Sequence, residues 1–426
     1  SAGADSALWA SHGHAELGAF KLGKTSPLVA TSGAAAMLAS YGVAADSLGE
    51  VTVAEVEDPA VRETVHEYEL ATSHYMATPE HFLWHARQAE ASGSSADFLS
   101  AVIVDEKSVW DYNRGIVSRD GVTRTLEDPP TDPLVPIYPS DGSYVADNPV
   151  IPVTGDWVDA NEQAAAADFV RYTQTAQAQE IVRASGYRDL NRELDDEVER
   201  TGQLSTAGTK IELAVDGDVL VAGQQAFPEV RKRANVLFLL DVSGSMDEKI
   251  STSDTKLTQA KKAIESALGH FTAGDHVGLA AFAQDPAGDE VPGQLTAMGD
   301  ISDNRDEFVS DLRGITSMGD TPLYWAVDTF AKQRAADWDP DRINAIVLLS
   351  DGEDDTNSPT TTEATMKKTL EGIHHDTPVL VFTLAYGKDA DVEALQGISG
   401  ATGAHYYDAT DPTQLEDVLG DLVTSF

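Results

Sequence analysis

The chain has 426 residues, of which 42% are hydrophobic and 23% charged, so length and composition predict two or three globular domains rather than a disordered or fibrous chain. Its 29 basic residues against 71 acidic ones give a formal charge of −42, which repels nucleic acid and anionic lipid and excludes them as favoured partners. The absence of cysteine excludes disulfides, thiolate metal sites and a cysteine nucleophile.

Residues 1–200 are predicted to form a separate α/β domain. Residues 20–27, followed by Thr31, Ser32 and Gly33, are typical of a strand, a loop and a helix start. Further apolar and turn-forming segments follow at residues 101–109, 112–113, 136–139 and 147–149. From about residue 20 to residue 191, these segments resemble the second half of a bacterial extracellular solute-binding protein. The resemblance implies a periplasmic-binding type II-like fold, and we expect part of its first lobe to be missing ahead of this sequence.

The start of the first of these helices has two interpretations. The hydroxyls and backbone amides of Thr31, Ser32 and Gly33 can face a small solute in a cleft between two lobes, because helix N-termini favour anions. The same residue types are equally suited to an ordinary N-cap. The sequence leaves both interpretations open and encodes no ligand type.

Two histidines in this region lie at a spacing that can hold zinc. His81 and His85 are one turn apart on a predicted helix that begins near Pro79. A metalloprotease motif needs a glutamate directly after the first histidine, where this chain has Phe82, so packing or surface histidines are favoured. The sequence also lacks a Gly-x-Ser-x-Gly elbow and a phosphate-binding loop. No catalytic residues are predicted, and we expect the protein not to be an enzyme.

Residues 201–230 are predicted to link this domain to the next. The preceding stretch, residues 191–200, is charged and has few large apolar residues. Asp216 and Gly217 stand between two apolar runs, which is typical of a two-residue turn. We therefore expect a hairpin within the linker.

Residues 231–426 are predicted to form a doubly wound, mostly parallel, Rossmann-like α/β sheet, because short apolar runs alternate regularly with helical patterns. The runs are almost entirely apolar, which is the pattern of strands buried on both faces. The expected strands are residues 235–240, 276–283, 344–350, 378–384 and 405–407. A last helix is expected to begin at Asp411, with Pro412 as its first residue.

Polar residues follow elements of this predicted sheet at its carboxyl edge, where ligand sites gather. Two follow strands directly as carboxylates, and the others are hydroxyls in a glycine-containing turn and before a helix. They are, in chain order, Asp241, Ser243, Ser245, Thr321 and Asp351. All are hard oxygen ligands suited to Mg²⁺ or Mn²⁺, so the pattern predicts a metal site made by these five residues.

From about residue 231 to residue 426, the chain resembles a von Willebrand factor type A domain with a complete metal-ion-dependent adhesion site. The family pattern is Asp-x-Ser-x-Ser, then a threonine and then an aspartate, and it is matched at all five positions. The resemblance implies that the hydroxyls bind the ion directly and that the aspartates often do so through water. One position is then open to a carboxylate from a partner. The implied cofactor is Mg²⁺ or Mn²⁺, with Ca²⁺ as a further option.

A purely structural interpretation competes with this one. In it, Asp241 and Ser243 cap a helix, and Asp351 with Gly352 forms a β-turn. The acidic residues 353–355 are interpreted as a solvated loop rather than as further ligands.

These patterns together predict a metal-dependent adhesion or protein-binding protein of the bacterial cell envelope. The expected partner is a protein that offers a carboxylate to the metal, and a small solute is expected at the first domain. Two alternatives remain open. One is a solute receptor or sensor whose type A domain is a docking module, and the other is a chelatase-type or ATPase-associated subunit.

The expected location is extracellular or in the cell envelope. The longest apolar runs are far shorter than the roughly 18 to 20 residues that a membrane-spanning helix needs. No signal-peptide pattern opens the sequence. We therefore expect any export signal and membrane anchor to lie outside it.

Overall fold

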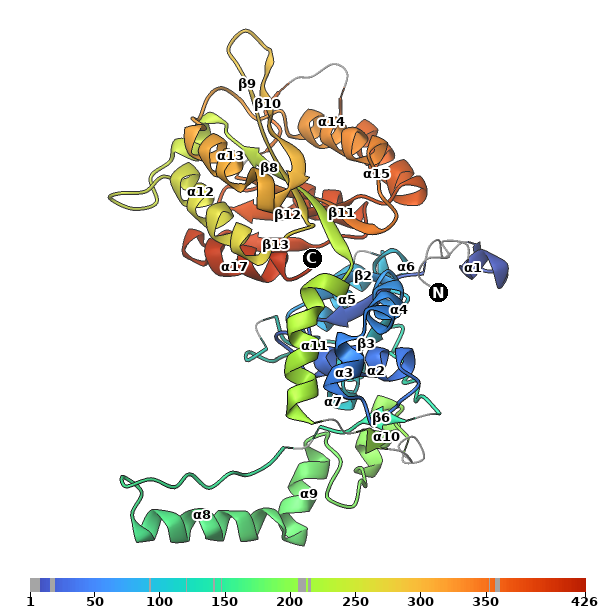
Figure 1. The fold of residues 1–426 in the computed structure, drawn as a ribbon. Helices are drawn as coiled ribbons and strands as arrows, with labels where there is room; N and C mark the ends of the chain where they lie inside the picture. Colours follow the sequence, from blue (N-terminus) through green and yellow to red (C-terminus); the bar gives the residue numbers. More distant parts are fainter. Residues whose placement is uncertain are drawn as a thin grey trace.

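The computed structural model describes residues 8–15, 20–91, 93–119, 121–140, 142–146, 148–205, 212–213, 216–351, 353–356 and 361–426. These residues form two bodies that meet end to end (Figure 1). We call residues 233–426 the upper unit and the residues before them the lower unit. The C-terminus lies where the two units meet.

The upper unit is built on one six-stranded sheet in the order β10-β9-β8-β11-β12-β13. Neighbouring strands are parallel except β10, which runs antiparallel to β9. The strands are β8 (Arg233–Asp241), β9 (His276–Gln284), β10 (Glu290–Asp300), β11 (Arg342–Ser350), β12 (Leu380–Tyr386) and β13 (Tyr406–Ala409). This is an α/β fold with a mostly parallel sheet, and all of the predicted strands are present.

Helices cover both faces of the sheet because successive side chains along a strand point to opposite sides. In β8, Val236 and Phe238 face one side and Leu237 and Leu239 the other, all at most 1% exposed. The first side packs against α12, α13 and α17, and the second against α14, α15 and α16. These helices are α12 (Lys256–Ala267), α13 (Ile301–Gly314), α14 (Leu323–Ala336), α15 (Glu363–Asp376), α16 (Val392–Gly400) and α17 (Leu415–Val423).

Two details of the upper unit differ from the sequence prediction. Strand β10 was not expected, because Pro292 and Gly293 interrupt its apolar pattern. Proline lacks the N–H that a ladder needs but is tolerated on an edge strand, which is where β10 lies. The last helix begins later than expected: Asp411 caps a 3-10 turn, Pro412–Gln414, and α17 starts at Leu415.

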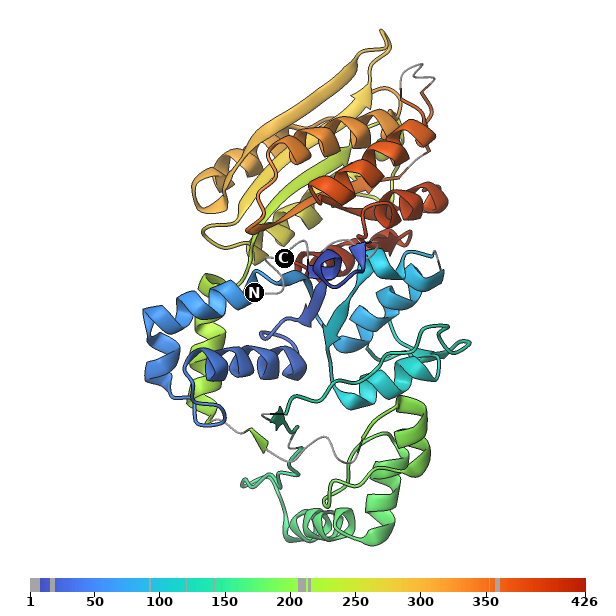
Figure 2. The same ribbon diagram turned by 90° about the vertical axis from the view of Figure 1, so that its right-hand side faces the viewer.

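The lower unit contains a three-stranded parallel sheet in the order β2-β1-β3, with helices packed around it (Figure 2). Its longer strands are β1 (Leu22–Thr25), β2 (Thr72–Met76) and β3 (Ala101–Ile103). Two short pairs are β4 (Ile116–Val117) with β5 (Thr125–Leu126) and β6 (Ser143–Tyr144) with β7 (Glu212–Leu213). The helices before residue 114 are α1 (Leu8–Ser11), α2 (Thr31–Ala44), α3 (Val53–Glu57), α4 (Pro59–Glu69), α5 (Pro79–Ala91), α6 (Ser95–Phe98) and α7 (Glu106–Asn113).

The hairpin expected around Asp216 is wrong, because a helix, α11 (Gly217–Val230), occupies this segment. Asp216 is its N-cap residue, and aspartate favours helix starts as strongly as turns. The helix buries Val219, Ala226 and Phe227 against α2, α3 and α4. Residues 217–230 are therefore part of the core of the lower unit rather than a linker. Only the short segment 231–232 separates this helix from β8.

The part of the chain from residue 148 to residue 203 projects away from the upper unit (Figure 1). Asp159 and Glu162 form a capping box at the start of α8 (Ala160–Thr173), and a second helix, α9 (Ala176–Ala184), follows it closely. The hydroxyl of Thr175 caps the N-terminus of α9, so a new helix begins there. The charged segment before residue 203 forms α10 (Asp196–Gly202), which packs on α7 through Val198. None of the described helices, α8 included, is both long and apolar enough to cross a membrane.

The core position of α11 makes a testable prediction. Replacing the buried Phe227 with alanine leaves a cavity beside Tyr75, whose ring centroid is 5.6 Å away, and should lower the free energy of unfolding by about 3–5 kcal/mol. Val221→Ala on the exposed face of the same helix should change it by less than about 0.5 kcal/mol. Urea unfolding followed by circular dichroism measures both, and equal effects would contradict the core position.

Candidate metal centre

The five predicted ligand residues are placed at the carboxyl edge of the upper sheet, at the end remote from the lower unit (Figure 1). Asp241 ends β8 and Asp351 directly follows β11. These strands are neighbours, and Leu240 is paired with Leu349, so the two strand ends lie side by side. The sheet register therefore brings the two carboxylates to one place.

The carboxylate of Asp241 is fully buried. Its Oδ1 accepts a hydrogen bond from the backbone N–H of Ser243 (2.9 Å), and its Oδ2 accepts one from the hydroxyl of Ser350 (2.6 Å). Burial raises the pKa of Asp241 to about 6, since the loss of water disfavours the charged form more than these hydrogen bonds favour it. The charged form of this carboxylate would gain from a cation placed beside it.

Hydrogen bonds link the two serines to the second aspartate. Oγ of Ser243 lies 2.9 Å from Oγ of Ser245, which donates to Oδ1 of Asp351 (2.7 Å). Oδ2 of Asp351 accepts from the ammonium of Lys256 (2.7 Å), and both of these side chains are buried. Asp351 thus has a cationic partner, whereas the two donors to Asp241 are neutral.

The loop that carries Thr321 is attached to the rest of the centre by backbone hydrogen bonds. The N–H of Gly244 donates to the carbonyl of Gly319 (2.9 Å), and the N–H of Asp355 donates to the carbonyl of Thr321 (3.2 Å). Gly319 has a φ of +59°, and a Cβ there would lie 1.7 Å from the carbonyl oxygen of Gln284, so only glycine fits. Thr321 itself is buried, at 3% exposure.

Sequence patterns did not reveal that Lys256, Ser350, Asp354 and Asp355 support this centre. Asp354 accepts a hydrogen bond from the N–H of Tyr324 (2.9 Å) in the first turn of α14. Asp355 accepts one from the N–H of Thr321. The acidic residues after Asp351 therefore hold the neighbouring loop in place and are more than a solvated loop. The sequence has no local signal for these two contacts, because Tyr324 and Thr321 are about 30 residues away from the aspartates that bind them.

The donor set suits a hard divalent cation. Two carboxylates and three hydroxyls on three loops are oxygen ligands of the kind that Mg²⁺ and Mn²⁺ prefer. The side chain of Ser243 makes no cap to the 3-10 turn Gly244–Asp247 that follows it, so helix capping does not explain its position. Within the described part of the chain, no three His, Asp or Glu side chains gather as metal ligands. An ion at this centre would therefore need hydroxyls as well as carboxylates as ligands.

The second predicted site lies at the start of α2. Its N-cap is Ala30, so the interpretation of Thr31, Ser32 and Gly33 as an N-cap is wrong. Oγ of Ser32 lies 2.8 Å from Oγ1 of Thr25 at the end of β1. A Cβ at Gly33 would lie 2.3 Å from the carbonyl oxygen of Thr25, so this glycine permits the helix to pack on the strand end. Solute binding by these residues stays a prediction.

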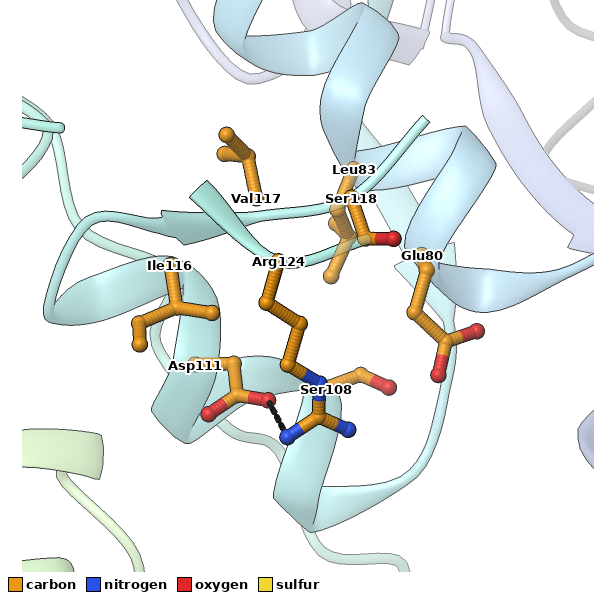
Figure 3. Close-up of a pocket in the computed structure, with 8 residues that line it drawn as sticks. All are labelled: Glu80, Leu83, Ser108, Asp111, Ile116, Val117, Ser118 and Arg124. Atoms are coloured by element: carbon orange, nitrogen blue, oxygen red, sulfur yellow. Dashed lines mark ion pairs between the residues drawn. The ribbon is translucent and has the colours of Figure 1, made fainter. Parts of the chain in front are cut away.

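A pocket of the lower unit lies on other elements (Figure 3). It is lined by Glu80, Leu83, Ser108, Asp111, Ile116, Val117, Ser118 and Arg124. The guanidinium of Arg124 faces the carboxylate of Asp111, with 3.6 Å between Nη1 and Oδ2. Lys107 and Arg114 pair with the same carboxylate, so the charge of Asp111 is already neutralised by the chain. The structure does not bring the predicted solute residues to this pocket.

Comparisons with known proteins agree with this architecture. Residues 235–421 match the model of the von Willebrand factor type A domain family, so this part of the chain carries such a domain. A search of curated proteins finds no match.

Among solved structures, the chain is similar to a von Willebrand factor type A protein from Catenulispora acidiphila, with 20% identity, a TM-score of 0.37, and coverage of 45% of this chain and 42% of that one. It is also similar to the ArnB paralog VWA2 from Sulfolobus acidocaldarius (17%, TM-score 0.32, 44% of each chain). A third similar structure is manganese-loaded Plasmodium vivax TRAP (13%, TM-score 0.32, 45% and 74%). The chain spans less than half the length of the first two of these proteins.

The buried charge of Asp241 makes a prediction about stability. Its folded pKa of about 6 lies above the unfolded value of 3.8, so stability is lost as the pH rises through this range. In the presence of a chelator at pH 7.5, Asp241→Asn should raise the free energy of unfolding by about 1–3 kcal/mol, and the gain should be about half as large at pH 5. Urea unfolding measures it. Asp247→Asn, at an exposed position of the same turn, should have little effect, and an equal gain there would contradict the assignment.

Proposed function

We propose that this protein binds a protein partner through a divalent cation held by Asp241, Ser243, Ser245, Thr321 and Asp351, and that it does so as a non-enzymatic adhesion protein of the bacterial cell envelope. The observation that carries the proposal is the fully buried carboxylate of Asp241, which has neutral donors and lies in a centre lined by hydroxyls. Such a carboxylate is costly to keep charged unless a cation binds there.

The charges of the centre favour an acidic partner. Asp241 and Asp351 contribute two negative charges, and the buried ammonium of Lys256 contributes one positive charge. A divalent ion would therefore leave the buried part of the centre with a net charge of about +1. The second partner of Lys256, Glu248, has a side chain that is 58% exposed, so water screens its charge. An incoming carboxylate would be attracted even though the chain as a whole is acidic.

Magnesium or manganese is the proposed ion. The donors are carboxylates and hydroxyls on short loops, which suit a small hard ion better than the six to eight ligands that calcium takes. The similar TRAP structure is loaded with manganese, which supports an ion of this class.

For the lower unit we propose a solute-binding-like fold that positions the type A domain, and an extracellular or envelope location for the whole. The parallel sheet β2-β1-β3 with helices packed around it supports an α/β fold of this kind. The parallel strands pack closely on α2 at Gly33, beside the proposed solute residues Thr31 and Ser32.

Metal binding is tested by calorimetry with Mg²⁺ and Mn²⁺. At about 0.15 M salt, where the Debye length is ~8 Å, diffuse binding to the acidic surface is screened. We expect one saturable site in the parent protein and none in Asp241→Ala. Glu353→Ala removes the same charge at an exposed position nearby and should keep the site. A site that survives in Asp241→Ala would show that the ligands are wrongly assigned.

Recognition of an acidic partner is tested with a panel of synthetic peptides in which each glutamate peptide has a glutamine counterpart. In Mg²⁺, the parent should bind some glutamate peptides and lose them on addition of chelator at fixed ionic strength, because the carboxylate completes the coordination of the ion. Chelator-insensitive binding, or equal binding of glutamate and glutamine peptides, would contradict the proposal. Fluorescence anisotropy of labelled peptides measures both.

A further inference from the structure

Four histidines gather where the two units meet. His74 lies on β2, His81 and His85 lie on α5, and His405 directly precedes β13. Three of them thus belong to the lower unit and one to the upper unit, and these elements face each other across the junction in both views (Figures 1 and 2). Each of the four side chains is at most 4% exposed.

The rings of these histidines contact one another directly. Nε2 of His85 lies 3.0 Å from Nε2 of His81. The ring centroid of His405 lies 4.2 Å from that of His85 and 5.0 Å from that of His74. Aromatic side chains surround the cluster, namely Phe82, Trp84, Phe98, Phe382 and Tyr407. His405 therefore completes a cluster that spans the two units.

The cluster is built for neutral imidazoles. Nε2 of His74 and Nε2 of His405 are buried without a hydrogen-bond partner among the described residues. Burial lowers the pKa of His74 to about 3 and that of His81 to about 4. Burial also holds the pKa values of His85 and His405 well below the usual range. A proton on any of the four would sit in a dry aromatic environment.

The charged and titratable groups around the cluster do not favour protonation. Arg119, from the segment after β4, adds a positive charge that further lowers the pKa values of His81 and His85. Its partner is Asp408 of β13, whose backbone carbonyl it binds at 2.9 Å. Tyr407 of β13 faces His85 with a centroid distance of 5.1 Å. The hydroxyl of Tyr407 lies 3.3 Å from Oγ of Ser425.

From α17, Asp421 acts on a group around the cluster: burial, and then the charge of Asp421, raises the pKa of Tyr407. The pKa of Asp421 itself is raised by burial, and the charge of Arg119 acts against this rise. Donor atoms of three or more of these histidines do not converge as metal ligands within the described residues. Neutral packing is therefore the state that the geometry favours.

The junction has other contacts that depend on its being closed. The N–H of Tyr75 donates to the carbonyl of Ser425 (3.2 Å). The ammonium of Lys232 donates to the carbonyl of Leu70 (3.3 Å) beside the short 231–232 connection. The chain passes between the units at that connection (Figure 1). Loss of the cluster would leave the two units joined by this connection and by the packing of α11 on the upper sheet, where Phe227 and Val236 belong to one cluster of buried side chains.

We propose that the four-histidine cluster is a pH-sensitive latch, which holds the two units together while the histidines are neutral and releases them when the histidines take up protons. In the closed state each histidine is neutral, and in the open state it is free to titrate with a pKa near 6.5. Each such histidine therefore makes the equilibrium constant for opening about tenfold larger at pH 5.5 than at pH 7.5. For all four, the opening equilibrium would shift by up to about 10⁴-fold over this range. The latch is independent of the metal centre, which lies at the other end of the sheet.

Opening is measured as a distance within the intact chain. Because the chain has no cysteine, Ala91→Cys on α5 and Asp417→Cys on α17 provide a unique pair of labelling sites, both at exposed positions. Energy transfer between two dyes is followed from pH 7.5 to pH 5, with chelator present and with circular dichroism to confirm that the sheet stays folded. We expect the dyes to separate below about pH 6.

A variant with His74→Phe and His405→Phe keeps aromatic packing and removes two titrating groups. The pH-driven shift of the opening equilibrium should then fall by about 10²-fold. The control is His375→Gln, at an exposed histidine, which should behave as the parent does. If the double variant does not fold, proton uptake by the labelled parent is measured instead, by calorimetry in buffers of different ionisation enthalpy, and should approach four protons on opening.

Three results would overturn the latch. The first is a dye distance that stays constant to pH 5 with the sheet folded. The second is a separation that is unchanged in the folded double variant, or proton uptake below one. The third is stoichiometric Zn²⁺ binding at pH 7.5 that is lost in the double variant, which would make the cluster a metal site.

Discussion

The burial of one carboxylate, that of Asp241, is the constraint on which the upper unit depends. A strand that is apolar from Val236 to Leu240 ends in a charged group at 0% exposure, so the surrounding loops have to compensate for lost water. They do so with the hydroxyl of Ser350 and the N–H of Ser243, and with loops joined by backbone hydrogen bonds. The raised pKa shows that this compensation is incomplete, which is what makes the place suited to a cation.

Asp351, the second aspartate, has a different environment from Asp241. This difference gives the centre a positively charged inner side and a solvent-exposed outer side. Lys256 neutralises Asp351 from one side, while the exposed Ser245 bridges from Asp351 toward the other serine. Positive charge from the chain therefore lies on the inner side of the centre, and the outer side is open to solvent at Ser245. A ligand with a negative group would approach from that outer side, although the net charge of the chain is −42.

The two ends of the upper sheet have opposite chemical character. At the carboxyl ends of the strands, a charge is buried among hydroxyls and needs a counter-ion. At the other end, uncharged imidazoles are buried among aromatic rings and are stable only without a proton. Helix α11 connects the lower unit to this sheet with a continuous core, since Phe227 and Val236 belong to the same cluster of buried side chains. The arrangement of the units therefore depends on packing at the junction rather than on a flexible linker.

The sequence by itself determined five of the six strands of the upper sheet and placed Asp241 and Asp351 at the carboxyl ends of two of them. These are local properties: an apolar run predicts a buried strand, and the residue after it lies at the sheet edge whatever surrounds it. Only the tertiary structure decided that Lys256 pairs with Asp351 and that His405 joins His74 and His85, because these partners are 95 to more than 300 residues apart. It also decided that Asp216 starts a helix and that β10 is an edge strand, since Asp-Gly and a strand with proline each suit two local structures and only packing selects between them.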